Sequence, residues 1–248
     1  MEPVTIDLCG YDKIDGAGGP VVWLCRFPAV LRELGINVRV RLLSWDPPEE
    51  GIVYQTLTKQ GFNVSGTEFK DTDSNIRWII DQVSCDPPDV FVPNLVTPAF
   101  YAARWIRAAG IPTVGILHSD DEFYHSIQDE FIFGEPSFAV SSVVCVSQEL
   151  QQQVAGRSPS TTIPIRIPYG VPTPENNAEL NGLGLRLAFV GRLAEEQKCI
   201  SQVTRAFCRA VTEVSGTTAT IFGDGPDKPN VERILNTEGA GLPIVLAG

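Results

Sequence analysis

Residues 4–43 read VTIDLCGYDKIDGAGGPVVWLCRFPAVLRELGINVRVRLL, and this stretch decides the fold. The apolar run at 4–9 predicts a buried strand, and the apolar periodicity of 20–34 predicts a helix that ends at Gly35. Residues 37–43 form a second apolar run, which predicts the next strand. Strand, helix and strand in this order predict a parallel βαβ unit.

The same alternation continues to about residue 167. We expect a kink or a division of the first helix at Pro28, because proline removes a backbone donor and clashes with the preceding turn. The rhythm predicts a mostly parallel sheet with helices on both faces. Further strands are predicted at 90–92, 113–117, 141–146 and 163–167. Further helices are predicted at 52–61, 74–83 and 99–109, and one begins at the N-cap residue Ser147.

A polar, turn-rich stretch at 173–184 predicts a linker between two domains, at 1–172 and 185–248. The second part has only three predicted strands, and a parallel sheet of three strands with one open edge is incomplete for this type of domain. We therefore expect a complete first Rossmann-like domain, only the first part of a second, and a sequence that is cut short at Gly248. The second part has predicted strands at 185–190, 218–222 and 243–247 and predicted helices near 195–214 and 228–236.

Composition limits the classes of partner. A net charge of −11 argues against nucleic acid or an anionic membrane as the main partner, because both select clustered Lys and Arg. No apolar stretch is long enough to predict a membrane span, and the N-terminus does not resemble a secretion signal. Six cysteines without a CxxC pair predict free thiols in a reducing cytoplasm, with neither disulfides nor zinc.

Ligands of open parallel sheets bind where strands end and loops lead into helices, and two such loops lie in the first part. Gly18 and Gly19 precede the first helix, where they predict either a phosphate cradle or simple turn geometry. His118 follows a predicted strand and precedes acidic residues at 120–122. Its position is consistent with a contact to a sugar hydroxyl or a proton-transfer group, and taken alone it favours a structural histidine that anchors the loop.

Two more such loops lie in the second part. In the first of them, Gly191, Arg192 and Lys198 follow a predicted strand. A guanidinium and an ammonium at a helix start predict a diphosphate clamp, the alternative being surface charges that pair with Glu195 and Glu196. The other loop, at 221–226, is a strong turn signal whose function depends on context.

Together these loops resemble, in order and spacing, the retaining glycosyltransferases of family 4, which have the GT-B fold. In the first part the matches are Gly18-Gly19 through Gly35, His118 with Asp120, and Tyr169-Gly170-Val171, where the family has Asn in place of Tyr. In the second part they are Phe189–Leu193 with Lys198, where Lys198-Cys199 replaces Lys-Gly, and Ile221–Pro226.

The resemblance implies an α/β, GT-B-like fold and a nucleotide-diphosphate sugar as donor, bound between the domains, with no cofactor and no required metal. The acceptor would be a carbohydrate or a lipid-linked molecule. The implied catalytic residues are His118 at the transferred sugar and Arg192 and Lys198 at the phosphates. The implied donor-binding residues are Gly18, Gly19, Gly170, Gly191, Gly223, Asp224 and Gly225.

Three alternatives stay open. The family's Glu-x7-Glu segment would lie beyond Gly248, so we expect little or no transferase activity from these 248 residues alone. A catalytically inactive GT-B-like module that binds a sugar or a protein is the main alternative, and the departures at Tyr169 and Cys199 favour it. Asp71-Thr72-Asp73 is the DxD pattern of metal-dependent transferases, although it follows no buried strand. The third alternative is a Rossmann-type regulatory module.

Overall fold

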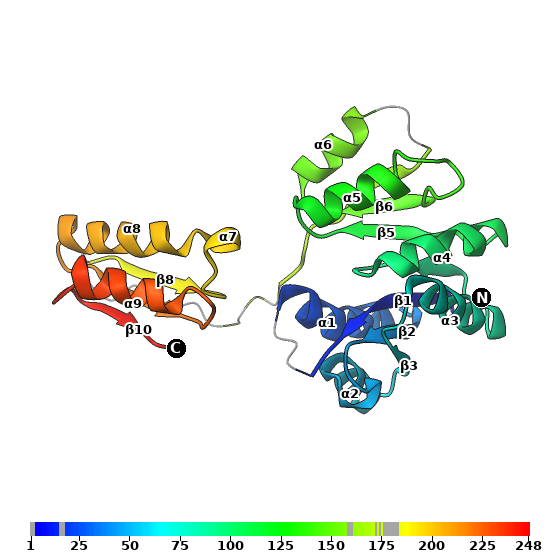
Figure 1. Cartoon of the computed structure of the whole chain (residues 1–248), viewed down its shortest axis with the longest axis horizontal. Helices are drawn as coiled ribbons and strands as arrows, with labels where there is room; N and C mark the ends of the chain where they lie inside the picture. The colour runs from blue at the N-terminus through cyan, green and yellow to red at the C-terminus, as the bar shows by residue number, and fades with distance from the viewer. Residues whose placement is uncertain (1–2, 15–17, 158–160, 172, 174, 176–183) are drawn as a thin grey trace. The chain divides into compact units, whose positions relative to one another are not determined.

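The chain forms two compact units, Met1–Val171 and Pro172–Gly248, each of which is described by itself. Most of the predicted linker at 173–184 lies outside the described residues. The computed structural model describes residues 3–14, 18–157, 161–171, 173, 175 and 184–248 (Figure 1).

The first unit alternates strands and helices along its length (Figure 1). All strands predicted for this unit are present. Its strands are β1 (Thr5–Asp12), β2 (Asn37–Ser44), β3 (Asn63–Glu68), β4 (Val90–Val92), β5 (Val114–Leu117), β6 (Ser142–Cys145) and β7 (Ile163–Arg166). Its helices are α1 (Gly19–Glu33), η1 (Pro48–Glu50), α2 (Ile52–Lys59), α3 (Thr72–Cys85), α4 (Thr97–Ala108), α5 (Glu122–Phe131) and α6 (Gln148–Gly156).

Every strand pair of the first unit is parallel. One sheet has the order β3-β2-β1-β4 and the other the order β5-β6-β7, and a parallel bridge between Phe91 and Thr113 connects them. The chain moves outward from β1 to β3 and then returns to β4 on the other side of β1. The order therefore reverses between β1 and β4, and such a switch point is where doubly wound sheets bind their ligands.

Helices cover both faces of this sheet arrangement. On one face, α1 and α2 bury Leu24 and Leu57 against strand residues such as Leu8 and Val40. On the other face, α3 to α6 bury a larger cluster that includes Phe100 and Phe131. This two-sided covering fixes the carboxyl ends of β1, β4 and β5 in a rigid frame.

Three local predictions for the first unit need correction. Pro28 does not divide the first helix, because α1 continues through it to Glu33. The third helix begins at Thr72 rather than Ser74, since the Asp71 carboxylate is its N-cap and accepts from the Ser74 backbone N–H at 2.9 Å. The sequence also gave no prediction of β3 or α5, both of which are present.

The second unit is a three-stranded parallel sheet of order β10-β9-β8. Its elements are β8 (Arg186–Val190), α7 (Glu195–Lys198), α8 (Ile200–Glu213), β9 (Thr218–Phe222), α9 (Lys228–Thr237) and β10 (Ile244–Leu246). The helix predicted near 195–214 is interrupted at Cys199, whose backbone is left-handed with φ 48°.

Both long helices of the second unit pack on one face of its sheet. Ile200 and Val231 pack there against Ile221 of the central strand. The opposite face exposes Val190, Phe222 and Val245, whose strand registers put them on that same side. Across the described residues of both units, no helix combines the length and apolar character that a membrane span requires.

Candidate functional site

A buried asparagine lies at the switch point of the first unit. Asn94 follows β4 and has no exposed surface, and its Nδ2 group has no hydrogen-bond partner among the described residues. The next residue, Leu95, has φ 61°, a left-handed conformation that bulky residues seldom adopt. A buried unpaired amide and a strained backbone each cost free energy, and such features concentrate at functional sites.

The predicted residue His118 contacts this asparagine. His118 follows β5, and its Nε2 lies 2.6 Å from the Asn94 Oδ1 atom. An amide oxygen only accepts hydrogen bonds, so Nε2 carries the proton and donates it. The other ring nitrogen, Nδ1, then accepts from the hydroxyl of Tyr169. These two bonds fix one neutral tautomer of the imidazole.

The environment of His118 favours that neutral form. Burial lowers the pKa of His118 from 6.5 to about 4, because a charged imidazolium loses its hydration there. At neutral pH the ring therefore offers one donor and one acceptor and carries no charge. A neutral imidazole suits a contact to an uncharged hydroxyl better than a contact to a phosphate.

Aromatic rings surround His118 on three sides. Trp23 of α1 meets it edge-on with ring centroids 5.0 Å apart, and Tyr169 stacks on it at 5.8 Å. The ring of Tyr124, from α5, lies 5.9 Å away. Burial raises the pKa of the Tyr124 hydroxyl, which makes no hydrogen bond of normal geometry. Rings around a few polar atoms are typical of small-molecule sites.

The predicted glycines of the first unit lie at the same edge. Gly18 is the N-cap of α1 and Gly19 its first residue, so both precede Trp23 by about one turn. The Gly18 carbonyl accepts from the Val22 backbone N–H, and no side chain caps this helix. Gly170 is exposed next to Tyr169. The structure therefore associates Gly18, Gly19 and Gly170 with His118 through the neighbouring aromatic residues.

In the second unit, the loops after β8 and β9 are joined by backbone hydrogen bonds. The Gly191 N–H donates to the Phe222 carbonyl at 3.0 Å, and the Leu193 N–H donates to the Asp224 carbonyl at 2.9 Å. A Cβ at Gly223 would lie 1.9 Å from the Gly191 oxygen. Close packing between the loops thus explains why residue 223 is glycine.

Two further members of this predicted set have structural partners. A Cβ at Gly225 would lie 2.4 Å from the Leu193 oxygen, so this glycine also serves the loop packing. The Asp224 carboxylate accepts from the Gly225 N–H at 2.8 Å and pairs with Lys228 at 3.5 Å. Neither contact requires a ligand.

Arg192 and Lys198 are exposed at the carboxyl edge of the second sheet. Arg192 lies in the loop after β8, and Lys198 is the last residue of α7. Within the described part of the chain, neither forms an ion pair. The Glu195 carboxylate, a partner considered for them, accepts instead from the Ser201 backbone N–H at 2.8 Å. Hydrogen bonds from the Ser201 hydroxyl and, to a smaller extent, from its backbone N–H lower the pKa of Glu195.

The carboxylates of the DxD pattern have structural roles. Asp71 caps α3, and Asp73 forms an exposed ion pair with Arg77 one turn later at 2.8 Å. Among the described residues, no group of three His, Cys, Asp or Glu side chains could hold a metal ion. Helix formation is therefore sufficient to explain this pattern.

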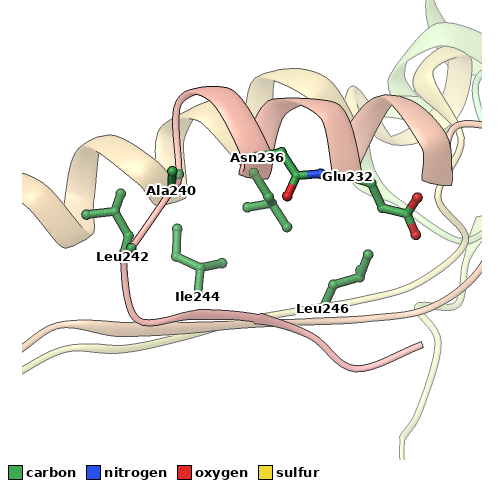
Figure 2. A pocket seen from close by; sticks show the side chains of 9 residues that line it. Glu232, Asn236, Ala240, Leu242, Ile244 and Leu246 are labelled. Atoms are coloured by element: carbon green, nitrogen blue, oxygen red, sulfur yellow. The ribbon is translucent and has the colours of Figure 1, made fainter.

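A hollow of about 380 Å³ lies away from these loops, between α9 and β10. Figure 2 shows the side chains of Leu242, Ile244 and Leu246 directed toward the helix, with Glu232 and Asn236 above them. Its lining combines aliphatic side chains with the polar side chains of Glu232 and Asn236, and it includes none of the predicted site residues.

Sequence reasoning missed Asn94, Trp23 and Tyr124. The sequence contains a feature that could have identified Asn94, because the pair Pro93-Asn94 directly follows the buried strand at 90–92. It contains no such feature for Trp23 and Tyr124, since both are part of ordinary amphipathic helix patterns. Their proximity to His118 depends on the strand order.

Comparison with known proteins identifies the fold. No protein-family model and no curated protein matches the sequence. A solved structure of the lipopolysaccharide outer core galactosyltransferase WaaB, in its apo form, is similar with a TM-score of 0.70 and 13% identity. The match covers 99% of this chain and 68% of that one.

Two further structures show the same likeness. A glycosyltransferase from Rickettsia africae ESF-5 has a TM-score of 0.66 at 12% identity, with 99% of this chain and 68% of that chain covered. A UDP-GlcNAc 2-epimerase from Neisseria meningitidis, bound to UDP-GlcNAc, has a TM-score of 0.59 at 10% identity, with 99% and 72% covered. The predicted α/β, GT-B-like fold class is confirmed.

Proposed function

We propose that this chain binds a nucleotide-diphosphate sugar and acts in transfer of the sugar to a carbohydrate or lipid-linked acceptor. We further propose a retaining, metal-independent reaction, as the family 4 resemblance implies. The observation that carries the proposal is the neutral His118, hydrogen-bonded on both sides at the switch point of a GT-B-like fold. The likeness to two sugar transferases supports it.

In this proposal, the first unit recognises the transferred sugar. A neutral imidazole accepts from a sugar hydroxyl without the cost of burying a charge. Asn94 would hold the ring in the required tautomer, and its unpaired Nδ2 group is a second donor beside it. In the structure the Tyr169 hydroxyl donates a hydrogen bond to the His118 Nδ1 atom. A sugar hydroxyl would take that place.

The second unit would hold the diphosphate. Arg192 supplies a planar fork of donors and Lys198 a point charge, and both are exposed at the strand ends. Cations in this position stabilise the negative charge that develops on the leaving nucleotide. The tight packing of the loops at Gly191 and Gly223 would support the base of a nucleoside pocket. That the residues of the first unit and the cations of the second unit face the same cleft stays a prediction.

Nucleotide binding tests this proposal directly. We expect calorimetry with UDP, GDP and ADP to show binding of at least one, weakened about tenfold or more by Arg192→Ala or Lys198→Ala. Arg209→Ala is the matched control, because the ion pair that this exposed arginine of the same unit forms among the described residues is with Glu213 on its own helix. The absence of nucleotide binding, or an equal loss in the control, would reject the proposal.

Epimerisation is a second candidate, since the fold is also similar to UDP-GlcNAc 2-epimerases. Transfer is favoured by the higher TM-scores of the two transferases and by the order of the sequence motifs. Incubation with UDP-GlcNAc and analysis of the sugar distinguishes the reactions, because an epimerase changes the sugar without any acceptor. Nucleotide-sugar binding with neither product would indicate the non-catalytic module.

A further inference from the structure

An exposed tryptophan lies at the carboxyl edge of the first unit's sheet, away from His118. Trp45 directly follows β2, and 60% of its surface is exposed. The Tyr11 ring meets it nearly perpendicularly with centroids 5.3 Å apart, and the Phe69 ring lies tilted against it at 4.5 Å. Trp45 is thus part of a cluster of three aromatic rings rather than a single scattered apolar side chain, and exposed apolar clusters can mark interaction sites.

The backbone around Trp45 is held firmly in place. The Trp45 N–H donates to the Asp12 carbonyl at 3.3 Å, and the Phe69 N–H donates to the Ser44 carbonyl at 2.7 Å. The Asp46 carboxylate accepts from the Ile14 N–H at 3.0 Å. These bonds tie together the ends of β1, β2 and β3. A ligand that stacks on this indole therefore meets a surface that is already ordered, which reduces the entropy cost of binding.

The Trp45 cluster and the surroundings of His118 border the same hydrophobic core. Tyr11 packs against the same hydrophobic core that contains Tyr124, and Tyr124 contacts His118. In the strand order, β1 lies between β2, which Trp45 follows, and β4, which Asn94 follows. A ligand that contains several sugar residues could therefore contact both Trp45 and the switch point.

The chemistry around Trp45 favours a neutral saccharide. The C–H groups of a pyranose ring carry partial positive charge and stack on the negative face of an aromatic ring. Carboxylates of Asp46, Glu49, Glu50 and Glu68 occur on the adjoining segments, where they can accept hydrogen bonds from sugar hydroxyls. Lys13 and Lys70 lie on the same segments, so the four carboxylates leave a net negative charge there, which disfavours a phosphate-rich or otherwise anionic partner.

We infer that Trp45, supported by Tyr11 and Phe69, is a stacking platform for the acceptor, and that this acceptor carries a neutral saccharide. The inference rests on the proposed function, because it assigns the acceptor side of that same site. It specifies the chemical class of the acceptor and the residue that binds it, whereas the proposed donor contacts are at other residues.

Side-chain NMR of the indole groups tests the platform. The chain has four tryptophans, so the indole N–H signals can be assigned with single variants. We expect methyl glucoside, methyl galactoside, N-acetylglucosamine or lactose at millimolar concentration to shift the Trp45 signal. Trp45→Ala should weaken saccharide binding about tenfold, and Trp45→Phe less because a ring remains; calorimetry measures both affinities, since these variants lack the Trp45 signal. Trp105→Ala is the matched control, since Trp105 is 48% exposed on α4.

The outcomes separate the platform from the proposed function. If UDP or GDP binds but none of these saccharides shifts Trp45, the platform is wrong and the donor proposal stands. If the saccharides shift Trp45 while no nucleotide binds, the platform stands and the donor proposal is wrong. A Trp45 shift that depends on protein concentration alone would indicate a second copy of the chain as the occupant, which also overturns the inference.

Discussion

In the first unit a buried asparagine, Asn94, is hydrogen-bonded to the partly buried His118, whereas in the second unit the candidate cations Arg192 and Lys198 are exposed. Asn94 and His118 are positioned by a sheet that helices cover on both faces. Arg192 and Lys198 extend from a sheet whose long helices lie on one face. The first arrangement suits recognition of uncharged hydroxyls, and the second suits attraction of a charged diphosphate.

The same contrast applies to ion pairs. In the first unit the buried Asp7 carboxylate contacts the Nε atoms of Arg39 at 2.5 Å and Arg41 at 3.2 Å. All three side chains are almost fully buried. In the second unit the Asp224–Lys228 pair lies at the surface. Stability should therefore depend on charge much more strongly in the first unit.

The largest expected effect comes from Asp7→Asn. This change leaves two buried guanidinium groups without their shared carboxylate, and it should cost about 3–5 kcal/mol of unfolding free energy. Asp224→Asn is the control and should cost less than about 1 kcal/mol. All four tryptophans, at 23, 45, 78 and 105, belong to the first unit, so their fluorescence during urea unfolding measures the effect of Asp7→Asn. The second unit contains no tryptophan, so far-UV circular dichroism measures the effect of Asp224→Asn. Equal losses in the two variants would contradict the contrast.

A smaller effect is expected from the titration of His118. Its folded-state pKa of about 4 lies below the ordinary 6.5, so the neutral ring stabilises the fold fully above pH 6.5. This contribution is lost as the pH falls from 6.5 toward 4. The pKa difference of about 2.5 units, at about 1.4 kcal/mol per unit, sets an upper limit of about 3.5 kcal/mol on this loss.

NMR titration of the histidine ring protons measures this pKa. His125→Gln removes the only other histidine and so assigns the His118 signals. Tyr169→Ala removes the ring that stacks on His118 and should raise its pKa toward 6.5. An ordinary His118 pKa in the unmodified chain would show that the site is open to water, against the buried tautomer described above.

Sequence patterns predicted most of the fold because its strands and helices have strong periodicity. The strand β3 was missed because its sequence, NVSGTE, contains one large apolar residue and a glycine. It is a strand because β2 pairs with it and because Gly66 leaves space for Pro48, which a Cβ would approach to 2.6 Å. Local propensity does not contain that tertiary information.

The candidate site was predictable only in part, for the same reason. His118 and the glycine loops could be identified because they directly follow strong strand patterns. The hydrogen bond between Asn94 and His118 joins residues 24 positions apart. It depends on β4 and β5 being neighbours, which a single sequence does not specify. The relevance of Tyr169 was noted only as a departure from the family pattern.

The smallest expected effect concerns Cys199, a position where the glycosyltransferase family has glycine. The structure supplies the physical reason for a glycine, since this residue joins α7 and α8 with φ 48°. A left-handed non-glycine residue costs about 1–2 kcal/mol. Cys199→Gly should therefore stabilise the second unit by about 1 kcal/mol, less than the full cost because glycine also gains freedom in the unfolded chain.

Far-UV circular dichroism follows this change, while tryptophan fluorescence should stay the same because it reports the first unit. Cys199→Ala is the matched control, since alanine removes the thiol but keeps the Cβ that causes the strain. Stabilisation by alanine as large as that by glycine would assign the effect to the thiol. Lys198 directly precedes this position, so nucleotide affinity in Cys199→Gly also tests the clamp. A turn without this backbone strain should preserve or improve nucleotide binding. A loss of binding would show that the left-handed cysteine itself orients Lys198.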